Sequence, residues 1–227
     1  MEDRLQDYPL RPYPKLIINC ALTGMVPTKG DTPYVPTDPE EIIRDAESCI
    51  EVGASMLHVH ARDEEGKPTY RKEIYREAIR GIRDLNEEVI ICASTSGRLF
   101  RDPVLRGEVL DLRGKAKPDM GSLTLGSFNF PGAIVALSRK GVGEDHSNSI
   151  SPNPPETIVD LAEHMKRRGI KPELEVFEAG MINYGLYLIR KGTIPDERPY
   201  FNLILGSLGA SRASMSSLAH MVDNLPS

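Results

Sequence analysis

The sequence predicts an α/β fold of the TIM (β/α)8 barrel type, with about six strand–helix units in its 227 residues. Short apolar runs rich in β-branched residues alternate strictly with longer segments whose apolar residues recur at helical spacing. Such alternation indicates a parallel sheet with right-handed crossovers. Polar residues end most of the predicted strands, where a TIM barrel builds its active site. An open doubly wound sheet is the alternative, although no GxGxxG motif follows any strand.

The first three strand–helix units are predicted between residues 16 and 115. The strands are the apolar runs at 16–21, within 54–63, and at 89–93. The helices are expected from a cap at Thr37 or Asp38 to a stop at Gly53, over 74–86, and over 102–115. Pro39 and the two acids after it suit the first turn of a helix, and the first two helices have an apolar face.

The other three units follow between residues 120 and 224. The strands are predicted at 120–125, 173–177 and 200–205, and the helices at 155–168, 180–191 and 215–224. Gly169 closes the first of these helices, and residues 131–153, rich in Gly, Ser and Asn, are expected to form a long connection. Residues 1–15 are polar and proline-rich, so we expect a surface arm followed by one incomplete TIM-barrel catalytic domain over 16–227.

The composition is ordinary for a soluble globular protein and argues against several classes. The formal net charge of -5 offers no basic surplus to neutralise phosphates, so no nucleic-acid partner is expected. The three cysteines, Cys20, Cys49 and Cys92, are far apart and form no CxxC pair, which favours a reducing cytoplasm over a disulfide framework. We see no apolar signal core at the N-terminus and no run as long as a membrane helix, so no membrane association is expected.

Two histidines in the predicted second strand are the strongest candidates for metal ligands. His58 and His60 are two residues apart, so in a strand their side chains point to the same side. Neutral imidazoles can each give one ring nitrogen to a metal and use the other to fix their orientation. The alternative is a pair of core histidines satisfied by hydrogen bonds. Two ligands do not complete a site, so a third ligand is expected from elsewhere in the chain.

Other polar strand ends supply candidates for substrate binding. Ser94 and Gly97 belong to a hydroxyl-rich turn of the kind that presents hydroxyl and N–H groups to an anion, although an ordinary polar loop has the same composition. Ser122 shares a face with Thr124 on the predicted fourth strand. Glu175 shares a face with Glu173 on the fifth, and an acid inside a barrel strand is costly unless it is paired or coordinated. Glu175 is therefore a candidate for orienting a catalytic group or for binding metal, whereas mid-strand Cys92 is more typical of a core residue.

Five segments in order resemble the β-keto acid cleavage enzymes, a family that includes the 3-keto-5-aminohexanoate cleavage enzymes. These segments are Leu16–Gly24, Pro36–Ile42, His58–Arg62, Ser122–Phe130 and Glu173–Met181. The resemblance runs from about Leu16 to the last residue. It implies a TIM barrel with a zinc ion, a cytoplasmic enzyme of amino acid catabolism, and a homo-oligomer.

The resemblance also implies a reaction and roles for individual residues. The reaction takes a β-keto acid and acetyl-CoA to acetoacetate and a new acyl-CoA. His58 and His60 match zinc ligands, Glu175 matches a glutamate that supports the catalytic groups, and Ser94, Gly97 and Ser122 match positions that hold the carboxylate of the keto acid.

This sequence departs from the family pattern at two places. The family has a third zinc ligand in a Gly-x-Glu-Asp stretch near the end of the barrel, and no such stretch follows Gly206 here. Val26 stands where the aminohexanoate enzymes have an acid that recognises the substrate's amino group, which points to another β-keto acid. We therefore expect residues 1–227 alone to bind zinc weakly, to show little cleavage activity, and to associate through open sheet edges. Another metal-assisted lyase or hydrolase on the same fold, and an inactive truncated homologue, are the alternatives.

Overall fold

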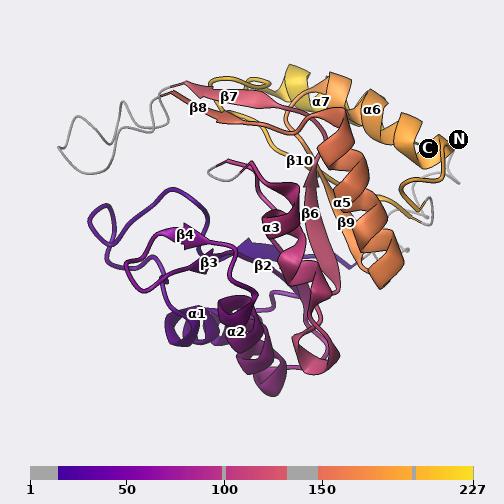
Figure 1. Cartoon of the computed structure of the whole chain (residues 1–227). Coiled ribbons are helices and arrows are strands. Elements are labelled where there is room, and N and C mark those ends of the chain that lie inside the picture. Colours follow the sequence, from indigo (N-terminus) through magenta and orange to yellow (C-terminus); the bar gives the residue numbers. More distant parts are fainter. Residues whose placement is uncertain (1–14, 99–100, 132–147, 196–197, 227) are drawn as a thin grey trace, which may run out of the picture.

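The computed structural model describes residues 15–98, 101–131, 148–195 and 198–226, and its centre is a six-stranded parallel sheet (Figure 1). The strands are β1 (Asn19–Ala21), β2 (Met56–Val59), β5 (Ile90–Ala93), β6 (Met120–Thr124), β9 (Lys171–Val176) and β10 (Tyr200–Leu203). In the sheet they lie in this same order, and each pairs in parallel with the next. A doubly wound sheet reverses its strand order at a switch point. The unbroken order therefore excludes that alternative and agrees with a barrel.

The sheet is strongly curled, as a contact across its concave side shows. Asn19 Nδ2 on β1 donates a hydrogen bond to Glu173 Oε1 on β9 at 3.3 Å, although β2, β5 and β6 lie between these strands. Neighbouring strands are about 4.8 Å apart, so a flat sheet would hold β1 and β9 about 19 Å apart. The architecture is thus a curled parallel half-barrel of six strands, and the predicted strand–helix alternation is confirmed.

Helices connect the strands and cover the convex face of the sheet (Figure 1). They are α1 (Pro39–Glu51), α2 (Lys72–Leu85), α3 (Pro103–Gly107), α5 (Pro155–Arg168), α6 (Ala179–Arg190) and α7 (Met215–Asp223), with 3₁₀ turns at Glu108–Asp111 and Gly114–Ala116. Alternate strand residues such as Leu57, Ile91 and Leu174 pack in one core with helix residues such as Ile79 and Ile158. The other face of the strands is left for the interior of the half-barrel.

Helix ends follow the signals in the sequence. The Asp38 side chain caps α1 by accepting a hydrogen bond from Glu41 N, and Pro39 is the first helical residue. Helix α5 has the predicted bounds, and Gly169 ends it with a left-handed φ of 58°. The predicted helix 102–115 is wrong in its second half, because α3 ends at Gly107 and the chain continues in 3₁₀ turns.

Two short antiparallel ribbons were not predicted. The ribbon of β3 (Ala61–Arg62) and β4 (Pro68–Thr69) follows the histidine strand. In the second ribbon, β7 (Phe128–Pro131) lies just before the expected long connection 131–153 and β8 (Asn148–Ser151) lies near its end; residues 132–147 lie outside the described part of the chain. The first strand begins at Asn19 rather than Leu16. The predicted arm also lies outside the described residues, apart from Lys15.

Candidate active site

The interior face of the half-barrel carries a cluster of polar side chains near the carboxyl ends of the strands. The registers pair His58 with Cys92, Ser122 with Glu173, and Thr124 with Glu175. Residues in register on parallel strands point to the same side of a sheet. Toward the amino ends of the strands the interior becomes apolar, where Met56 and Met120 pack with Cys92. The polar side chains therefore lie where a TIM barrel places its active site.

Glu173 is the centre of this cluster. Its side chain is fully buried, and each carboxylate oxygen accepts two hydrogen bonds. The donors are His58 Nδ1 at 2.7 Å and Cys92 Sγ at 3.1 Å on Oε2, and Asn202 Nδ2 at 3.1 Å and Asn19 Nδ2 at 3.3 Å on Oε1. Burial raises the pKa of Glu173, but the hydrogen bonds and charge from these donors, chiefly His58, outweigh burial and lower it overall. Glu173 is therefore held as a carboxylate.

The two histidines lie side by side, as their spacing predicts, with ring centroids 5.0 Å apart. Burial lowers the pKa of His58, but the hydrogen bond to Glu173 and its charge raise it overall. Because Nδ1 of His58 donates to Glu173, its Nε2 is the nitrogen left for a ligand. Burial, with the charges of His58 and Arg62, holds the pKa of His60 well below its usual range, so His60 is neutral.

A buried nitrogen of His60 supports a metal site here. His60 Nδ1 is buried and has no hydrogen-bond partner among the described residues. An unpaired buried nitrogen is costly, and a metal ion satisfies it. In the described ranges, His58, Cys92 and Glu173 have ligand atoms within 4.8 Å of one another. However, 2.7 Å between His58 and Glu173 is a hydrogen bond, and burial raises the pKa of the Cys92 thiol well above its usual range. The arrangement suits a carboxylate that orients a histidine ligand.

Glu175 lies two residues further along β9, on the same face as Glu173. Its Oε2 accepts a hydrogen bond from Thr124 Oγ1 at 2.6 Å. Burial raises the pKa of Glu175, and the charge of Glu173 adds to this, while His58 and the Thr124 bond oppose it. The two acids on this face therefore have opposite shifts, which is the pattern of groups with different chemical tasks.

The residues predicted to bind a carboxylate come together on neighbouring strand ends. Ser94 and Ser122 are both buried. Thr95 N donates to Ser122 Oγ at 3.0 Å, and Thr95 Oγ1 donates to Ser122 O at 2.5 Å, which ties the turn after β5 to β6. A Cβ on Gly97 would lie 2.6 Å from Arg106 Nη1 and 2.8 Å from Pro152 O. The turn needs glycine because a buried arginine packs against it.

The sequence of this chain matches the family model for the beta-keto acid cleavage enzyme over residues 15–227. The chain belongs to the β-keto acid cleavage enzyme family.

Curated members of this family agree over most of the chain. The chain is 33% identical over 213 residues to a 3-keto-5-aminohexanoate cleavage enzyme of Acetoanaerobium sticklandii. This match covers 94% of the chain and 71% of that enzyme. A second one, from Fusobacterium nucleatum, is 35% identical, with 93% of this chain and 70% of the relative covered. A 3-oxoadipate:acetyl-CoA acetyltransferase of Cupriavidus necator is 32% identical, with 92% and 66% covered. The family thus includes acetyl-CoA-dependent transferases that act on different keto acids.

Solved structures agree on the fold of this β-keto acid cleavage enzyme family member. The apo structure of ObcA superposes with a TM-score of 0.63 at 21% identity, over 77% of this chain and 36% of ObcA. The ternary complex of ObcA with a C4-CoA adduct and oxalate gives 0.65 at 20% identity, over 82% and 40%. The chain therefore spans about two fifths of the length of ObcA, and the likeness supports the half-barrel fold.

Sequence reasoning on this family member missed several residues of the site. Glu173 carried a usable signal, because it alternates with Glu175 in a predicted strand. Asn19 and Asn202 carried none, since they reach Glu173 only through the curl of the sheet. Arg106 lies in the segment predicted as a helix over 102–115, and nothing in the sequence marked its side chain as buried.

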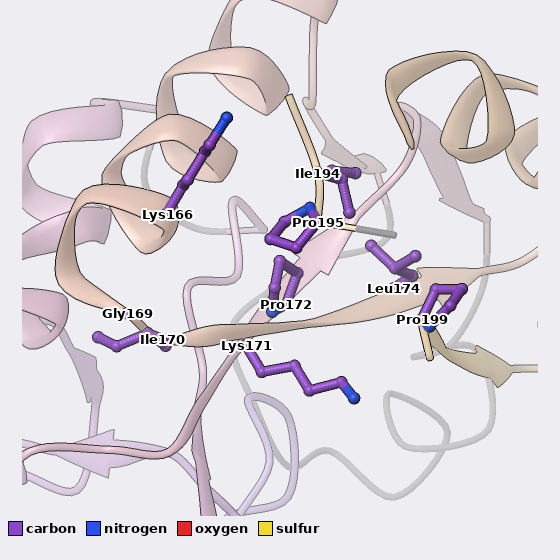
Figure 2. A pocket seen from close by; sticks show the side chains of 9 residues that line it. All are labelled: Lys166, Gly169, Ile170, Lys171, Pro172, Leu174, Ile194, Pro195 and Pro199. Carbon is purple, nitrogen blue, oxygen red and sulfur yellow. The ribbon is translucent and has the colours of Figure 1, made fainter. Parts of the chain in front are cut away.

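A pocket of about 320 Å³ lies elsewhere, at the amino end of β9 (Figure 2). Lys166, Ile170, Pro172 and Pro195 are among the residues that line it, and it lies on the helix side of the sheet. The half-barrel interior with its histidines faces the other way. This pocket therefore lies apart from the candidate site.

Proposed function

We propose that this chain is a zinc-dependent β-keto acid cleavage enzyme, which takes a β-keto acid and acetyl-CoA to acetoacetate and a new acyl-CoA. The observation that carries the proposal is the histidine pair inside the half-barrel. Glu173 orients His58, and neutral His60 beside it has a buried nitrogen with no partner in the described residues. This is the donor chemistry of a catalytic zinc site.

In this proposal His58 and His60 are zinc ligands. A zinc ion held there supplies Lewis-acid stabilisation for negative charge on the keto oxygen of the substrate. Glu173 holds His58 in the tautomer that leaves Nε2 for the ligand position.

The hydroxyl-rich strand ends supply the substrate's carboxylate site. In this proposal the carboxylate is held by Ser94, Ser122 and the main chain at Gly97. Two observations support this assignment: both serines are buried, and both lie at or after strands β5 and β6, which follow the histidine strand in the sheet. Glu175 is proposed to support the catalytic groups, since burial raises its pKa toward that of a group able to exchange protons. Val26 lies in the loop after β1 and offers no charge to a substrate ammonium, which favours a keto acid without an amino group.

The reaction exchanges one carbon–carbon bond for another. The bond between the α-carbon and the keto carbon of the β-keto acid breaks, and the α-carbon forms a bond to the acetyl carbonyl of acetyl-CoA. The CoA thiol leaves the acetyl group and takes up the remaining acyl group. Acetoacetate thus contains the acetyl group together with the α-carbon and carboxylate of the keto acid, and the new acyl-CoA contains the rest of the keto acid together with CoA.

We also propose a homo-oligomer in the cytoplasm. Leu16 and Ile17, just before edge strand β1, are 83% and 56% exposed, and exposed apolar residues at a sheet edge favour association. All three cysteines are free thiols, which supports a reducing compartment. Within the described ranges, no helix has the length and apolar character to cross a membrane.

Isotopically labelled acetyl-CoA tests the reaction. Zinc-loaded protein is mixed with labelled acetyl-CoA and a panel of β-keto acids, and the products are read by mass spectrometry. We expect label to enter acetoacetate slowly, in line with the weak zinc binding predicted from the sequence, together with a matching unlabelled acyl-CoA. Both products are lost in His58→Ala and His60→Ala variants, which also retain less zinc. Label released as free acetate, or β-keto acid consumed without acetyl-CoA, would instead identify a hydrolase or a simple lyase.

A further inference from the structure

The turn 94–97 is held from its outer side by three buried side chains. Each of the three successive main-chain carbonyls before Gly97 accepts a hydrogen bond from a different residue. The pairs are Tyr75 OH with Ser94 O at 3.3 Å, Arg106 Nε with Thr95 O at 2.8 Å, and Tyr70 OH with Ser96 O. All three donor residues are at most 6% exposed. Such complete support of consecutive carbonyls is more than an ordinary polar loop needs.

Fixing the carbonyls also aims the N–H groups of the same peptides. In a trans peptide the C=O and the following N–H point in opposite directions. Tyr75 binds Ser94 O, and the N–H of that peptide, on Thr95, donates to Ser122 Oγ on the other side. Tyr70 binds Ser96 O, and the N–H of that peptide belongs to Gly97. In the described part of the chain this Gly97 N–H has no acceptor, so it is available to an anion.

Arg106 joins this turn to two other strand ends. Its Nη2 donates to Asn153 Oδ1 at 2.6 Å and its Nη1 to Pro152 O at 3.3 Å, both just after β8. Asn153 in turn donates from its main-chain N to Ser127 Oγ at 2.7 Å, just after β6. The guanidinium therefore ties together the carboxyl ends of three strands.

The charge of Arg106 is not neutralised by direct contact. Its hydrogen-bond acceptors in the described residues are carbonyl oxygens and the amide oxygen of Asn153, and the side chain is 2% exposed. Burial lowers the pKa of Arg106, and the charges of Tyr70 and Glu175, which form no ion pair with it among the described residues, oppose this only in part. Burying a cation without a paired anion is costly. An anion bound at the turn would offset that cost, which links this cation to the carboxylate of a substrate.

We propose that Arg106 is a positioning residue for the substrate carboxylate, acting through the turn 94–97, with Tyr70 and Tyr75 as its partners. The proposal rests on the proposed function and goes beyond it, because none of the three residues touches the substrate. Together they fix the direction of the Gly97 N–H and of the Ser122 hydroxyl. The carboxylate then meets donors that need no rearrangement on binding.

Conservative variants test this role. Arg106→Lys keeps the charge but lacks the planar fork that reaches three acceptors, whereas Tyr70→Phe and Tyr75→Phe each remove one hydroxyl. Affinity for acetoacetate is measured by isothermal titration calorimetry on the zinc-loaded chain, and the KM and kcat of the cleavage reaction are measured with a β-keto acid and acetyl-CoA. Tyr184→Phe on α6, outside the site, is the control.

The expected signature is a loss of carboxylate affinity alone. We expect the Kd for acetoacetate and the KM for the β-keto acid to rise about tenfold or more in Arg106→Lys and about two- to tenfold in each Phe variant. The kcat, the KM for acetyl-CoA and the zinc content stay unchanged, because the carboxylate is held equally in ground and transition states. If Arg106→Lys fails to fold, the two Phe variants carry the test.

Three other results would overturn the proposal in different ways. The first is that the wild-type protein binds acetoacetate no better than a variant with Ser94 and Ser122 both replaced by alanine. That result would contradict the proposed function, and the positioning role with it. Tight wild-type binding that is unchanged in Arg106→Lys and both Phe variants would remove the positioning role alone. A fall in kcat with unchanged KM for the β-keto acid would also overturn it, since loss of folded protein has that effect.

Discussion

Replacing Glu173 by glutamine tests whether the interior of the half-barrel needs a carboxylate at this position. All four neighbours of the side chain are donors, two on each oxygen. A carboxylate only accepts, whereas a glutamine amide has one accepting oxygen and one donating NH₂ group. Whichever way the amide is turned, its NH₂ group faces two donors.

The size of the effect follows from these conflicts. Each buried donor that loses its acceptor costs about 1–3 kcal/mol, so two donors cost about 2–6 kcal/mol. His58 can relieve one conflict by moving its proton from Nδ1 to Nε2 and accepting from the amide. Then Nε2 is no longer available to a metal. The variant therefore loses stability, metal affinity or both, and loss of such a carboxylate lowers metal affinity about 10- to 100-fold.

Two measurements on one protein separate these effects. Urea unfolding followed by circular dichroism gives the free energy of unfolding of the zinc-free chain, and competition with a chromophoric chelator gives the zinc Kd. Glu175→Gln is the matched control, two residues along the same face, because its partner Thr124 donates through a hydroxyl and can bond the amide oxygen equally well. We expect the control to change stability by less than about 1 kcal/mol. A Glu173→Gln variant with wild-type stability and wild-type zinc affinity would refute the reasoning.

Three further substitutions test other parts of the structure. Gly97→Ala should lower the free energy of unfolding by about 1–3 kcal/mol in urea titrations, because its Cβ would overlap Arg106. Gly180→Ala on α6, whose Cβ would meet Glu178 Oε1 at an ordinary 3.8 Å, should instead raise it by up to about 1 kcal/mol. Ser122→Ala should raise the KM for the β-keto acid about two- to tenfold with little change in zinc content, and an unchanged KM would contradict its place in the carboxylate site. Gly169→Ala should cost about 1–2 kcal/mol in the same urea assay, because its φ of 58° is strained for alanine, and an equal or higher stability would contradict the left-handed cap.

The fold could be predicted largely from local signals. Helix α5 was predicted to the residue because a proline opens it and Gly169 closes it. The strand order followed from strict alternation, since sequential crossovers of one hand leave few arrangements. The hairpin of β7 and β8 escaped prediction because both strands are only four residues long and β8 has Ile150 as its one apolar residue. The edge strand β1 begins late because Leu16 and Ile17 lie beyond its pairing with β2 and are exposed.

The candidate site was predictable only as far as periodicity reaches. A spacing of two places His58 beside His60 and Glu173 beside Glu175 on one face, and the structure keeps both pairs together. Which residue of one pair meets the other depends on how far the sheet curls and on how its strands are staggered between β2 and β9. Curl is a property of the whole sheet, set by strand twist and by the packing of every helix outside it. It brings Glu173, rather than Glu175, within 2.7 Å of His58. The pairing of Glu173 with His58, which orients the proposed metal ligand, therefore depends on packing at the convex face, on the other side of the sheet from the residues proposed to carry the chemistry.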